Sequence, residues 1–554
     1  MIFSKDESNA ESNIDVEKLD YVFEVSKTRD KIDFITWLLE IPDDECQEGL
    51  KNIRATNAAF SILYDILNRV RKCTIVYEDN YVDRVYRDSY YFHYSGKHFD
   101  YARFCKRICL FSGEIKGNFY ECDSKVLEKK FIGSIVIQPI PGRSVGRTLL
   151  NPKYILKLKP GYIRLGDYNI TVYGKRLHVR AFPFSMQDGE TTSCAEITIL
   201  NLLDYFSQTY SEYRYLLPSS ISLIAEQNSY ERRIPTTGLS YEIISKIFCE
   251  AGFYPRLYAT NKMEKAKFKR ILHYYIESGI PVALGLKVNE DAKHSVIGIG
   301  YTTPNRELID RQAFCAFDVQ SFDAIWICDT ADTVNSYCIM DDNTAPYTIY
   351  ECEEKNDKSN HKADALYLEQ FEVEYLMVPL YKRMYLEASD AYEICMNILA
   401  SKDLGINTFA QNNIAFTSLK NRYFDVENIG SKDNPLVIRL FMASSRSFRK
   451  HRDLQIVNDE VRYIYNYTTF PKFIWVCEIA TRQMYMSGKI LGEIIIDATS
   501  SADAKTSSFI IIQYPGVICS QLHNAITDCV EPKFEGISGW TEYPCFDGNL
   551  QLFK

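Results

Sequence analysis

The stretch Phe184-Ser-Met-Gln-Asp-Gly-Glu-Thr-Thr-Ser-Cys-Ala195 and the apolar run CAEITILNLLDYF (194–206) that overlaps its end decide how this chain is interpreted. Hydroxyl side chains at 191–193 are typical helix N-caps, and the apolar run has the length of a buried helix. We therefore predict a helix that begins at Cys194, immediately after a polar loop. Such a junction exposes a side chain at the positive end of the helix dipole.

Cys194 has the surroundings that thiol catalysis requires. A helix N-terminus favours a thiolate, and an oxyanion needs preorganised N–H donors. The backbone N–H of Cys194 and the side-chain amide of Gln187, seven residues upstream, are candidates for these donors. The alternative interpretation is that Cys194 is an ordinary first residue of a helix and that Gln187 belongs to a surface loop.

Two segments downstream supply partners for a reactive thiol. His294 leads the apolar strand HSVIGIGY, and Asp341 and Asp342 directly follow the strand SYCIM. If these two strands are neighbours, His294 can act as general base and acid while an aspartate orients its imidazole. We assign the acid to Asp341, with Asp342 and Asp329, which follows the strand WIC, as alternatives. A capping histidine and a simple Asp-Asp-Asn turn are the plainer explanations.

Composition places the chain among globular proteins of several domains. It has 554 residues, 46% hydrophobic and 25% charged, which excludes wholesale disorder and suggests about three or four domains. The net charge is 64 − 73 = −9. A mildly acidic chain has no global attraction for nucleic acid.

The pattern of elements predicts an α+β fold in three parts. Residues 1–180 are predicted to be helical up to about residue 125 and then to form strands. Residues 181–365 run from helices to strands with antiparallel spacing, and residues 366–554 form a C-terminal α+β domain. Because helices and strands do not alternate as βαβ units, the class is α+β rather than α/β. The charged segment 351–365 is predicted to be a surface loop or linker.

The cysteines indicate a reduced protein rather than a metal protein. There are sixteen of them against eight histidines, no CxxC pair occurs, and many lie inside apolar strands, where a thiol packs as a small hydrophobe. We expect no structural metal and no cofactor. The N-terminus lacks the apolar region of a secretory signal, and no apolar stretch reaches 18 residues. The expectation is therefore a cytoplasmic protein without a membrane segment.

A basic stretch near residue 450 is a second candidate site. It concentrates four cations with hydroxyl groups, so it could bind phosphate or another anionic partner; these cations are Arg446, Arg449, Lys450 and Arg452. The alternative is a solvated loop or helix end. A nucleic-acid partner is not expected, and the sequence gives no indication of the oligomeric state.

The order Gln, Cys at a helix start, His at a strand start and Asp after the next strand resembles that of papain-like cysteine peptidases. HSVIGIGY and the helix-rich insertion before it look most like the bacteriocin-processing, double-glycine-leader type, the peptidase C-thirty-nine-like group. QDGxxxxCA, DDNTAPY, RLFMASSRSFRKHR and FIWVCEI together look like a group of large bacterial proteins. The core resemblance covers 183–350. It departs from the family pattern in the Ala-Glu after Cys194, in the doubled Asp and in lacking transporter segments.

This resemblance implies a central papain-like core, a helix lobe plus an antiparallel sheet, flanked by N-terminal and C-terminal α+β domains. It also implies that Cys194 is the nucleophile, His294 the general base and acid, Asp341 or Asp342 the orienting acid, and Gln187 an oxyanion donor. The implied activity is cleavage of a peptide or isopeptide bond in a protein or peptide substrate. A deamidase or acyltransferase would use the same triad, and a degenerate papain-like scaffold without activity is the alternative from another class.

Overall fold

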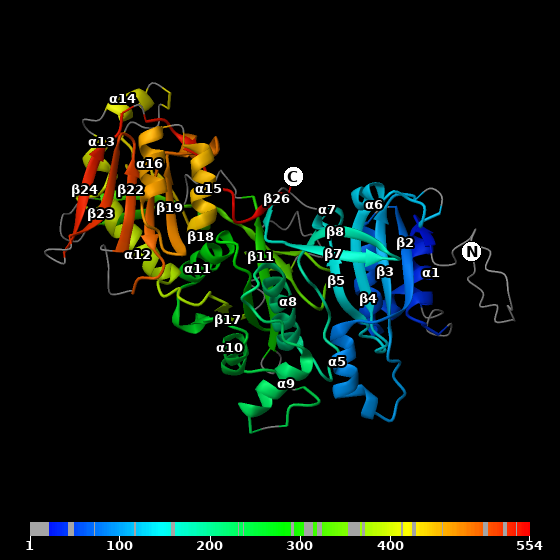
Figure 1. The fold of residues 1–554 in the computed structure, drawn as a ribbon. Helices are drawn as coiled ribbons and strands as arrows, with labels where there is room; N and C mark the ends of the chain where they lie inside the picture. The colour runs from blue at the N-terminus through cyan, green and yellow to red at the C-terminus, as the bar shows by residue number, and fades with distance from the viewer. Residues whose placement is uncertain are drawn as a thin grey trace.

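The computed structural model describes residues 22–42, 49–70, 72–115, 118–156, 161–230, 232–236, 238–289, 293–303, 314–317, 324–352, 366–367, 372–410, 414–420, 422–423, 428–456, 458–501, 508–524, 529–538 and 540–553. The chain is of the α+β class, as the sequence predicts, with helices and largely antiparallel sheets. Three large sheets follow one another across the molecule, and the middle of the chain lies between the two terminal regions (Figure 1). Of the predicted linker, 351–365, the part 353–365 lies outside the described residues.

The N-terminal sheet has five antiparallel strands in the order β1-β2-β3-β4-β5. They are β1 (Val22–Val25), β2 (Cys73–Tyr81), β3 (Cys105–Ser112), β4 (Phe131–Ile137) and β5 (Val145–Leu150). Successive side chains of a strand point to opposite faces, so Ile75 and Tyr77 of β2 pack with one apolar cluster while Val76 packs with another.

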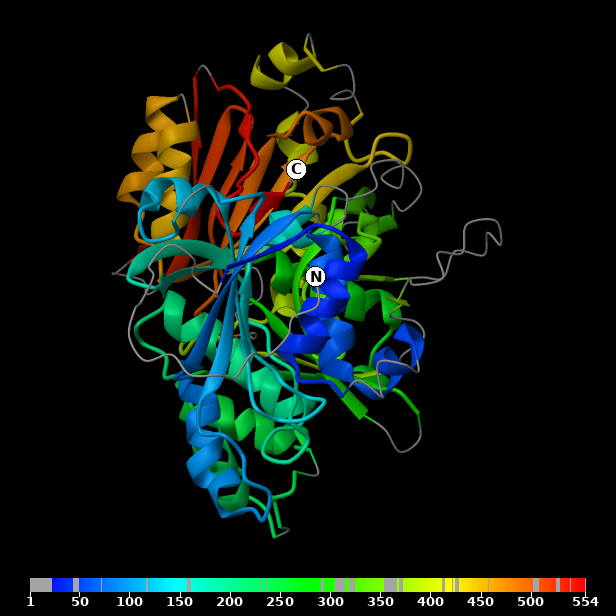
Figure 2. The same cartoon turned by 90° about the vertical axis from the view of Figure 1, so that its right-hand side faces the viewer.

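Helices cover one face of this sheet and a hairpin covers the other. The first cluster includes α1 (Thr28–Leu38), α3 (Leu50–Thr56) and α4 (Ala58–Arg69). The second includes the hairpin of β7 (Gly166–Val172) and β8 (Lys175–Ala181). Figure 2 looks onto this region and shows the blue helices on one side of the strands. The remaining elements are α5 (Arg84–Phe92), the 3-10 turn η1 (Tyr94–Gly96), α6 (Ser124–Lys130) and α7 (Pro152–Ile155).

Three strands precede residue 125, where the sequence predicts mainly helix. β1, β2 and β3 are the first three strands of the sheet. The apolar, β-branched start of β2 (CTIVY) favours a strand, and its buried residues are what the helices α1 and α4 pack against. The predicted order of helices first and strands later is therefore wrong for this part of the chain.

The central sheet has the strand order β16-β15-β14-β11-β10-β17-β9, and β6 joins β11 to β26. Its strands are β6 (Gly161–Ile163), β9 (Arg256–Ala259), β10 (Val282–Lys287), β11 (Lys293–Thr302), β14 (Ser336–Met340), β15 (Thr348–Glu351), β16 (Leu366–Tyr367), β17 (Glu372–Val378) and β26 (Gln551–Phe553). The helices of this region are α8 (Cys194–Thr209), α9 (Pro218–Gln227), α10 (Tyr241–Glu250) and α11 (Lys265–Glu277), with the turn η2 (Thr260–Lys262). β14 pairs with β11, so the strand before the doubled Asp is the neighbour of the His294 strand.

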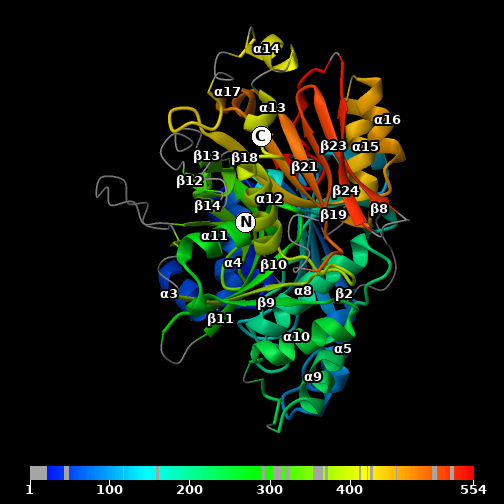
Figure 3. The same cartoon turned by 90° about the vertical axis from the view of Figure 1, so that its left-hand side faces the viewer.

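The C-terminal sheet has the strand order β12-β13-β18-β19-β21-β22-β23-β24. Its strands are β12 (Phe314–Phe317), β13 (Ala324–Asp329), β18 (Leu436–Ser444), β19 (Phe473–Ala480), β21 (Gly492–Asp497), β22 (Phe509–Tyr514), β23 (Val517–Asn524) and β24 (Cys529–Gly536). Figure 3 shows α15 (Ser445–Gln455) and α16 (Asp459–Tyr467) on one face and α12 (Ala388–Ala400) on the other. The shorter elements are η4 (Thr330–Thr333), α13 (Ile406–Ala410), α14 (Ile414–Lys420), α17 (Arg482–Met486), β20 (Lys489–Ile490) and β25 (Tyr543–Pro544).

Strand pairing crosses the domain limits that the sequence predicts. β17 comes after residue 365, yet it lies beside β10 in the central sheet. β13 comes before residue 365, yet it pairs in parallel with β18 of the C-terminal sheet. β6 and β26, from the two terminal regions, pair with each other, and β6 pairs with the far end of β11. The central sheet is therefore completed by segments from all three predicted domains.

No helix in the described part of the chain is both long enough and apolar enough to cross a membrane.

Candidate active site

Cys194 is the first residue of α8, where the sequence predicts a helix start. Ser193 is the N-cap, and its backbone N–H donates to Oε2 of Glu196 in the first turn, at 3.0 Å. The helix is buried from Ala195 to Phe206, so the core of the central region fixes its direction. Among the described residues, the backbone N–H groups of Cys194 and Ala195 have no acceptor. They are the N–H groups that a helix N-terminus leaves free.

The packing of α8 on β11 brings Cys194 to His294. Thr198, one turn after Cys194, donates its hydroxyl to the carbonyl oxygen of Ser295 at 3.2 Å. Ser295 is the residue after His294, which is the second residue of β11. The side chain of Cys194 is partly exposed. It lines the same cavity as His294, and it is one of the groups that raise the pKa of the His294 ring.

Asp341 lies on the other side of the His294 ring. Its Oδ1 is 2.7 Å from Nε2 of His294, which leaves the second ring nitrogen for Cys194. Asp341 also accepts hydrogen bonds from the backbone N–H of Asn343 at 2.9 Å and from the Tyr350 hydroxyl at 2.5 Å. These donors hold the carboxylate in place, so it can orient the imidazole as the acid of a triad does.

The surroundings of His294 favour its charged form. Burial alone lowers the pKa of His294, but the hydrogen bonds with Asp341 and Cys194 outweigh burial and raise it to about 10. Burial also raises the pKa of Asp341, and here the hydrogen bonds from His294 and Tyr350 outweigh it and hold the pKa below its ordinary value. His294 and Asp341 are thus an imidazolium and a carboxylate at neutral pH. An imidazolium beside a thiol stabilises the thiolate.

Asp342, the alternative acid, has a different environment. Its Oδ1 is 3.5 Å from Nε2 of His294 and has no hydrogen-bond partner. Its Oδ2 accepts from the backbone N–H of Gln187 at 3.3 Å. Burial raises the pKa of Asp342 to about 6, with the nearby His294 lowering it and Asp341 raising it. The geometry therefore favours Asp341 as the orienting acid, and Asp342 ties the Gln187 loop to β14.

Gln187 lies close to the site through its backbone. Its side chain has no hydrogen-bond partner among the described residues, and it is not part of the cavity wall that Cys194 and His294 share. Its role as an oxyanion donor stays a prediction.

The loop before Cys194 is held by its own aspartate and by the N-terminal region. Asp188 Oδ1 accepts from the backbone N–H groups of three residues, Glu190, Thr191 and Thr192, at 2.8–2.9 Å. Glu190 is 2.6 Å from both His93 Nε2 and Lys97 Nζ, which flank η1. The loop that positions Cys194 is therefore fixed from outside the central region.

Cys194 and His294 line a cavity of about 790 Å³, within the size range of ligand pockets. One wall consists of Asn228, Ser229, Tyr230, Arg233, Gly238, Leu239, Ser240, Glu242 and Ile243, and the other of Gly285, Leu286, Lys293, Ser295, Glu374 and Tyr375. The ring of Tyr375 lies on Gly285, where a Cβ atom would overlap it. The ring of Tyr241 on α10 lies near the same ring, with centroids 6.2 Å apart.

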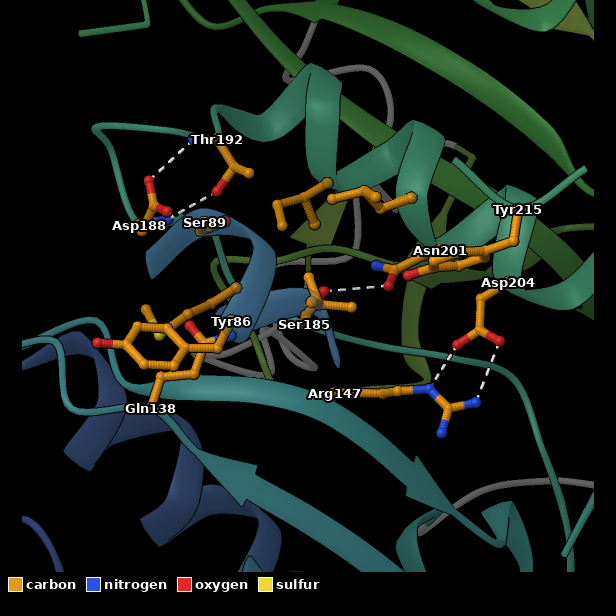
Figure 4. Close-up of a pocket in the computed structure, with 14 residues that line it drawn as sticks. Tyr86, Ser89, Gln138, Arg147, Ser185, Asp188, Thr192, Asn201, Asp204 and Tyr215 are labelled. Atoms are coloured by element: carbon orange, nitrogen blue, oxygen red, sulfur yellow. Dashed lines mark hydrogen bonds and ion pairs between the residues drawn. The ribbon is translucent and has the colours of Figure 1, made fainter. Parts of the chain in front are cut away.

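A smaller cavity of about 30 Å³ lies behind this loop, between α5 and α8. Figure 4 shows its polar lining, with Asp188 bonded to Thr192, Ser185 to Asn201, and Arg147 to Asp204. It is large enough for about one water molecule. Neither Cys194 nor His294 lines it, so it belongs to the support of the loop rather than to the reaction site.

Asp329 is not part of the constellation. It ends β13 in the C-terminal sheet, where it is fully buried and accepts hydrogen bonds from the Tyr274 hydroxyl and from the backbone N–H of Ala331. Burial raises the pKa of Asp329 to about 6. The alternative assignment of Asp329 as the orienting acid is wrong, because β13 pairs with β18 and not with the His294 strand.

The predicted anion site lies on α15 and contains Arg446, Arg449, Lys450 and Arg452. Arg452 is fully buried, with its guanidinium 2.5 Å from Glu478 and 2.7 Å from Glu493. Arg449 donates to the carbonyl oxygen of Thr468 at 2.8 Å. Arg446 and Lys450 are exposed. The prediction is therefore wrong for Arg452, which is held inside the C-terminal region by two carboxylates.

The same site residues have the composition of a metal site. His294, Asp341 and Asp342 each offer a ligand atom, and these atoms lie within 4.8 Å of one another. However, the Asp341 oxygens already accept hydrogen bonds from His294, Asn343 and Tyr350. Hydrogen bonding therefore accounts for the grouping, and a chelation test separates the two explanations.

Several residues of the site were not indicated by the sequence. Tyr350 supports Asp341, and Tyr375, Arg233 and Glu374 line the cavity. Tyr375 and Glu374 lie on β17, beyond the predicted end of the central domain. No local motif distinguishes these positions, because their roles depend on strand pairing.

No family model matches the chain, and comparison with curated proteins and with solved structures gives no match.

Proposed function

We propose that this protein is a cysteine peptidase that cleaves a peptide or isopeptide bond through Cys194, His294 and Asp341. The observation that carries the proposal is the juxtaposition of three side chains: Cys194 and His294 line one cavity, and Nε2 of His294 is 2.7 Å from Asp341. This cavity is large enough for several peptide residues.

The reaction follows from the charge states of the site. The Cys194 thiolate attacks the acyl carbon, and the His294 imidazolium gives its proton to the leaving amine as the carbon–nitrogen bond breaks. The ring, now neutral, takes a proton from water as the water attacks the thioester. Breaking of the carbon–sulfur bond then releases the acid product and restores the Cys194 thiolate beside the His294 imidazolium. Asp341 keeps the ring in one orientation throughout.

The oxyanion of each tetrahedral intermediate needs N–H donors. The backbone N–H groups of Cys194 and Ala195 lack acceptors among the described residues and lie at the positive end of α8. Donors of this kind are preorganised, since the helix holds them before the substrate arrives.

The same triad would serve a deamidase or an acyltransferase, because only the leaving group or the acceptor differs. The peptidase is preferred since the cavity, about 790 Å³, is formed by residues of several helices and strands and has room for a substrate that extends beyond the scissile bond. A degenerate scaffold is disfavoured by the shared position of Cys194 and His294 in the cavity wall and by the four polar contacts that hold Asp341 and Asp342.

A thiol-reactive probe tests the proposal. A peptidyl vinyl sulfone should label wild-type protein at Cys194, and Cys194→Ala should remove this label. Because Cys249 is also exposed, both proteins should carry Cys249→Ser. Labelling that persists in the Cys194→Ala protein, or that is unaffected by His294→Ala, would contradict the proposal.

Hydrolysis is measured separately from labelling. A mixed peptide library should gain new amino termini with the wild type and not with Cys194→Ala. Activity should survive a chelator such as EDTA, because the mechanism has no metal. Labelling without new termini under all conditions would favour the scaffold, and loss of turnover in EDTA would favour a metal site at His294.

A further inference from the structure

Arg233 is a buried cation on the wall of the candidate active-site cavity. It lies between α9 and α10 with only 7% of its surface exposed. One nitrogen of its guanidinium donates to the carbonyl oxygen of Gly238. Within the described part of the chain, no carboxylate comes within ion-pair distance of it. Buried arginines are almost always paired, so this one is available for a partner that the described residues do not supply.

The two glutamates of the cavity wall do not pair with Arg233. Lys293 is 2.8 Å from Glu374, and these two residues lie next to each other on the sheet wall. Glu242 is exposed, and a hydrogen bond from Ser240 lowers its pKa below the ordinary value. Neither glutamate neutralises Arg233.

The segment that carries Arg233 is held firmly against the nucleophile loop. Thr236 donates its backbone N–H to the carbonyl oxygen of Glu190 at 2.9 Å and its hydroxyl to Glu196 Oε1 at 2.9 Å. Glu190 and Glu196 flank Cys194 in the sequence. Arg233 is therefore positioned relative to Cys194 by the same contacts that position the start of α8.

A second feature points to an anionic ligand at the same wall. The first turn of α10, a helix of 10 residues, contributes Glu242 and Ile243 to the cavity, and its N-cap Ser240 lies there too. The N-terminus of a helix carries partial positive charge and free N–H groups. The protonated His294 adds another positive group. Arg233 thus lies in a part of the cavity where a negative charge is favoured.

We propose that Arg233 is the anchor of a carboxylate-binding subsite, so that the preferred substrates carry a carboxylate close to the scissile bond. The carboxylate is either an acidic side chain on the acyl side or the free C-terminus of a short leaving peptide. This inference rests on the proposed peptidase function and names its substrate class.

The physical basis is that the folded protein has already removed the guanidinium from water. A substrate carboxylate that reaches Arg233 gains a charge-assisted hydrogen bond, which can be bidentate because the guanidinium is a planar fork. Such a bond is weakly screened by salt because it is buried. A neutral amide of the same shape cannot replace it.

Matched probes test the subsite. Peptidyl vinyl sulfones that differ only by Glu or Gln at one of the first three acyl-side positions are compared by their rates of Cys194 labelling. A second pair carries the leaving-side peptide as a free acid or as an amide. We expect one Glu probe, or the free acid, to label about 10-fold or more faster than its neutral match.

Arg233→Gln should abolish this preference, and Arg233→Lys should keep part of it. Arg232→Gln is the matched control, since Arg232 is the exposed neighbour and its removal should leave the preference unchanged. Which probe pair responds identifies the source of the carboxylate.

Iodoacetamide separates the two possible failures. If iodoacetamide and all probes fail to label Cys194, the proposed function is wrong. Two other outcomes would show that the carboxylate subsite is wrong while the peptidase proposal stands. In the first, Cys194 is labelled but acidic and neutral probes react equally. In the second, Arg233→Gln keeps the preference for acidic probes and its iodoacetamide rate stays at the wild-type value.

Discussion

The pH dependence of Cys194 alkylation follows from the charge on His294. The pKa of His294 is raised to about 10 by its hydrogen bonds with Asp341 and Cys194, against the effect of burial. The ring therefore stays protonated up to about pH 9, and a cation beside a thiol favours reaction through the thiolate. We predict that the rate of alkylation of Cys194 by iodoacetamide is nearly constant between about pH 6 and pH 9.

His294→Ala removes the imidazolium, and this should change both the alkylation rate of Cys194 and the way in which that rate varies with pH. A free thiol with the ordinary pKa of about 8.5 is roughly 0.3% thiolate at pH 6. His294→Ala should therefore give a rate that rises about tenfold per pH unit. A thiolate of lower basicity is also a weaker nucleophile, so we expect the wild type to exceed His294→Ala by about 10- to 100-fold at pH 6 and much less near pH 9.

The assay is a timed alkylation with acid quench, followed by peptide mass spectrometry of the segment that contains Cys194. Cys249 serves as an internal reference within the same sample, because it is exposed and burial raises its pKa. Its rate should rise steeply over the same range in both proteins. A Cys194 profile that rises in parallel with that of Cys249 in the wild type would refute the ion-pair reasoning.

Three further changes probe the remaining contacts. Asp341→Asn should lower peptide hydrolysis by about 100-fold, whereas Asp342→Asn should leave it within a few-fold, both as measured by kcat/KM. Folding raises the pKa of Asp342 to about 6, so the wild type loses stability as pH rises from about 4 through 6. The free energy of unfolding of Asp342→Asn should therefore increase by up to about 3 kcal/mol relative to the wild type over that window. The measurement is a Tm difference that grows with pH. Gly285→Ala should push the Tyr375 ring into the cavity and slow vinyl sulfone labelling at least several-fold, with iodoacetamide labelling unchanged. Equal kcat/KM losses for the two asparagine variants, a Tm difference independent of pH, or unaltered vinyl sulfone labelling would each contradict the corresponding contact.

The parts of the site that the sequence predicts are those set by local signals. The helix start at Cys194 follows from a hydroxyl cap and a long apolar run, and both act within a few residues. The strand of His294 and the strand before Asp341 follow from apolar runs bounded by polar residues. That these two strands are neighbours is a hypothesis at the level of sequence, and the pairing of β11 with β14 confirms it.

The parts that the sequence does not predict are set by long-range pairing. The strands before Asp329 and Asp341 are both short and apolar, yet one joins the C-terminal sheet and the other the central sheet. Arg452 belongs to a basic stretch that suggests a surface position. The two glutamates that pair with it lie far along the chain, on β19 and β21. Tyr375 reaches the cavity because β17 returns to the central sheet. No periodicity encodes which partner such a strand takes, because its partner is chosen by packing of the whole core.

The doubled Asp illustrates how the fold separates two identical side chains. Asp341 receives hydrogen bonds from His294, Asn343 and Tyr350, so its carboxylate is stabilised and its pKa lies below the ordinary value. Asp342 is equally buried but accepts one backbone hydrogen bond, and its pKa is raised to about 6. Since like charges this close oppose joint ionisation, Asp341, which accepts more hydrogen bonds, takes the charge. A pair of carboxyl groups whose environments move their pKa values apart has distinct roles, and here the ionised member is the one in contact with Nε2 of the histidine that meets Cys194.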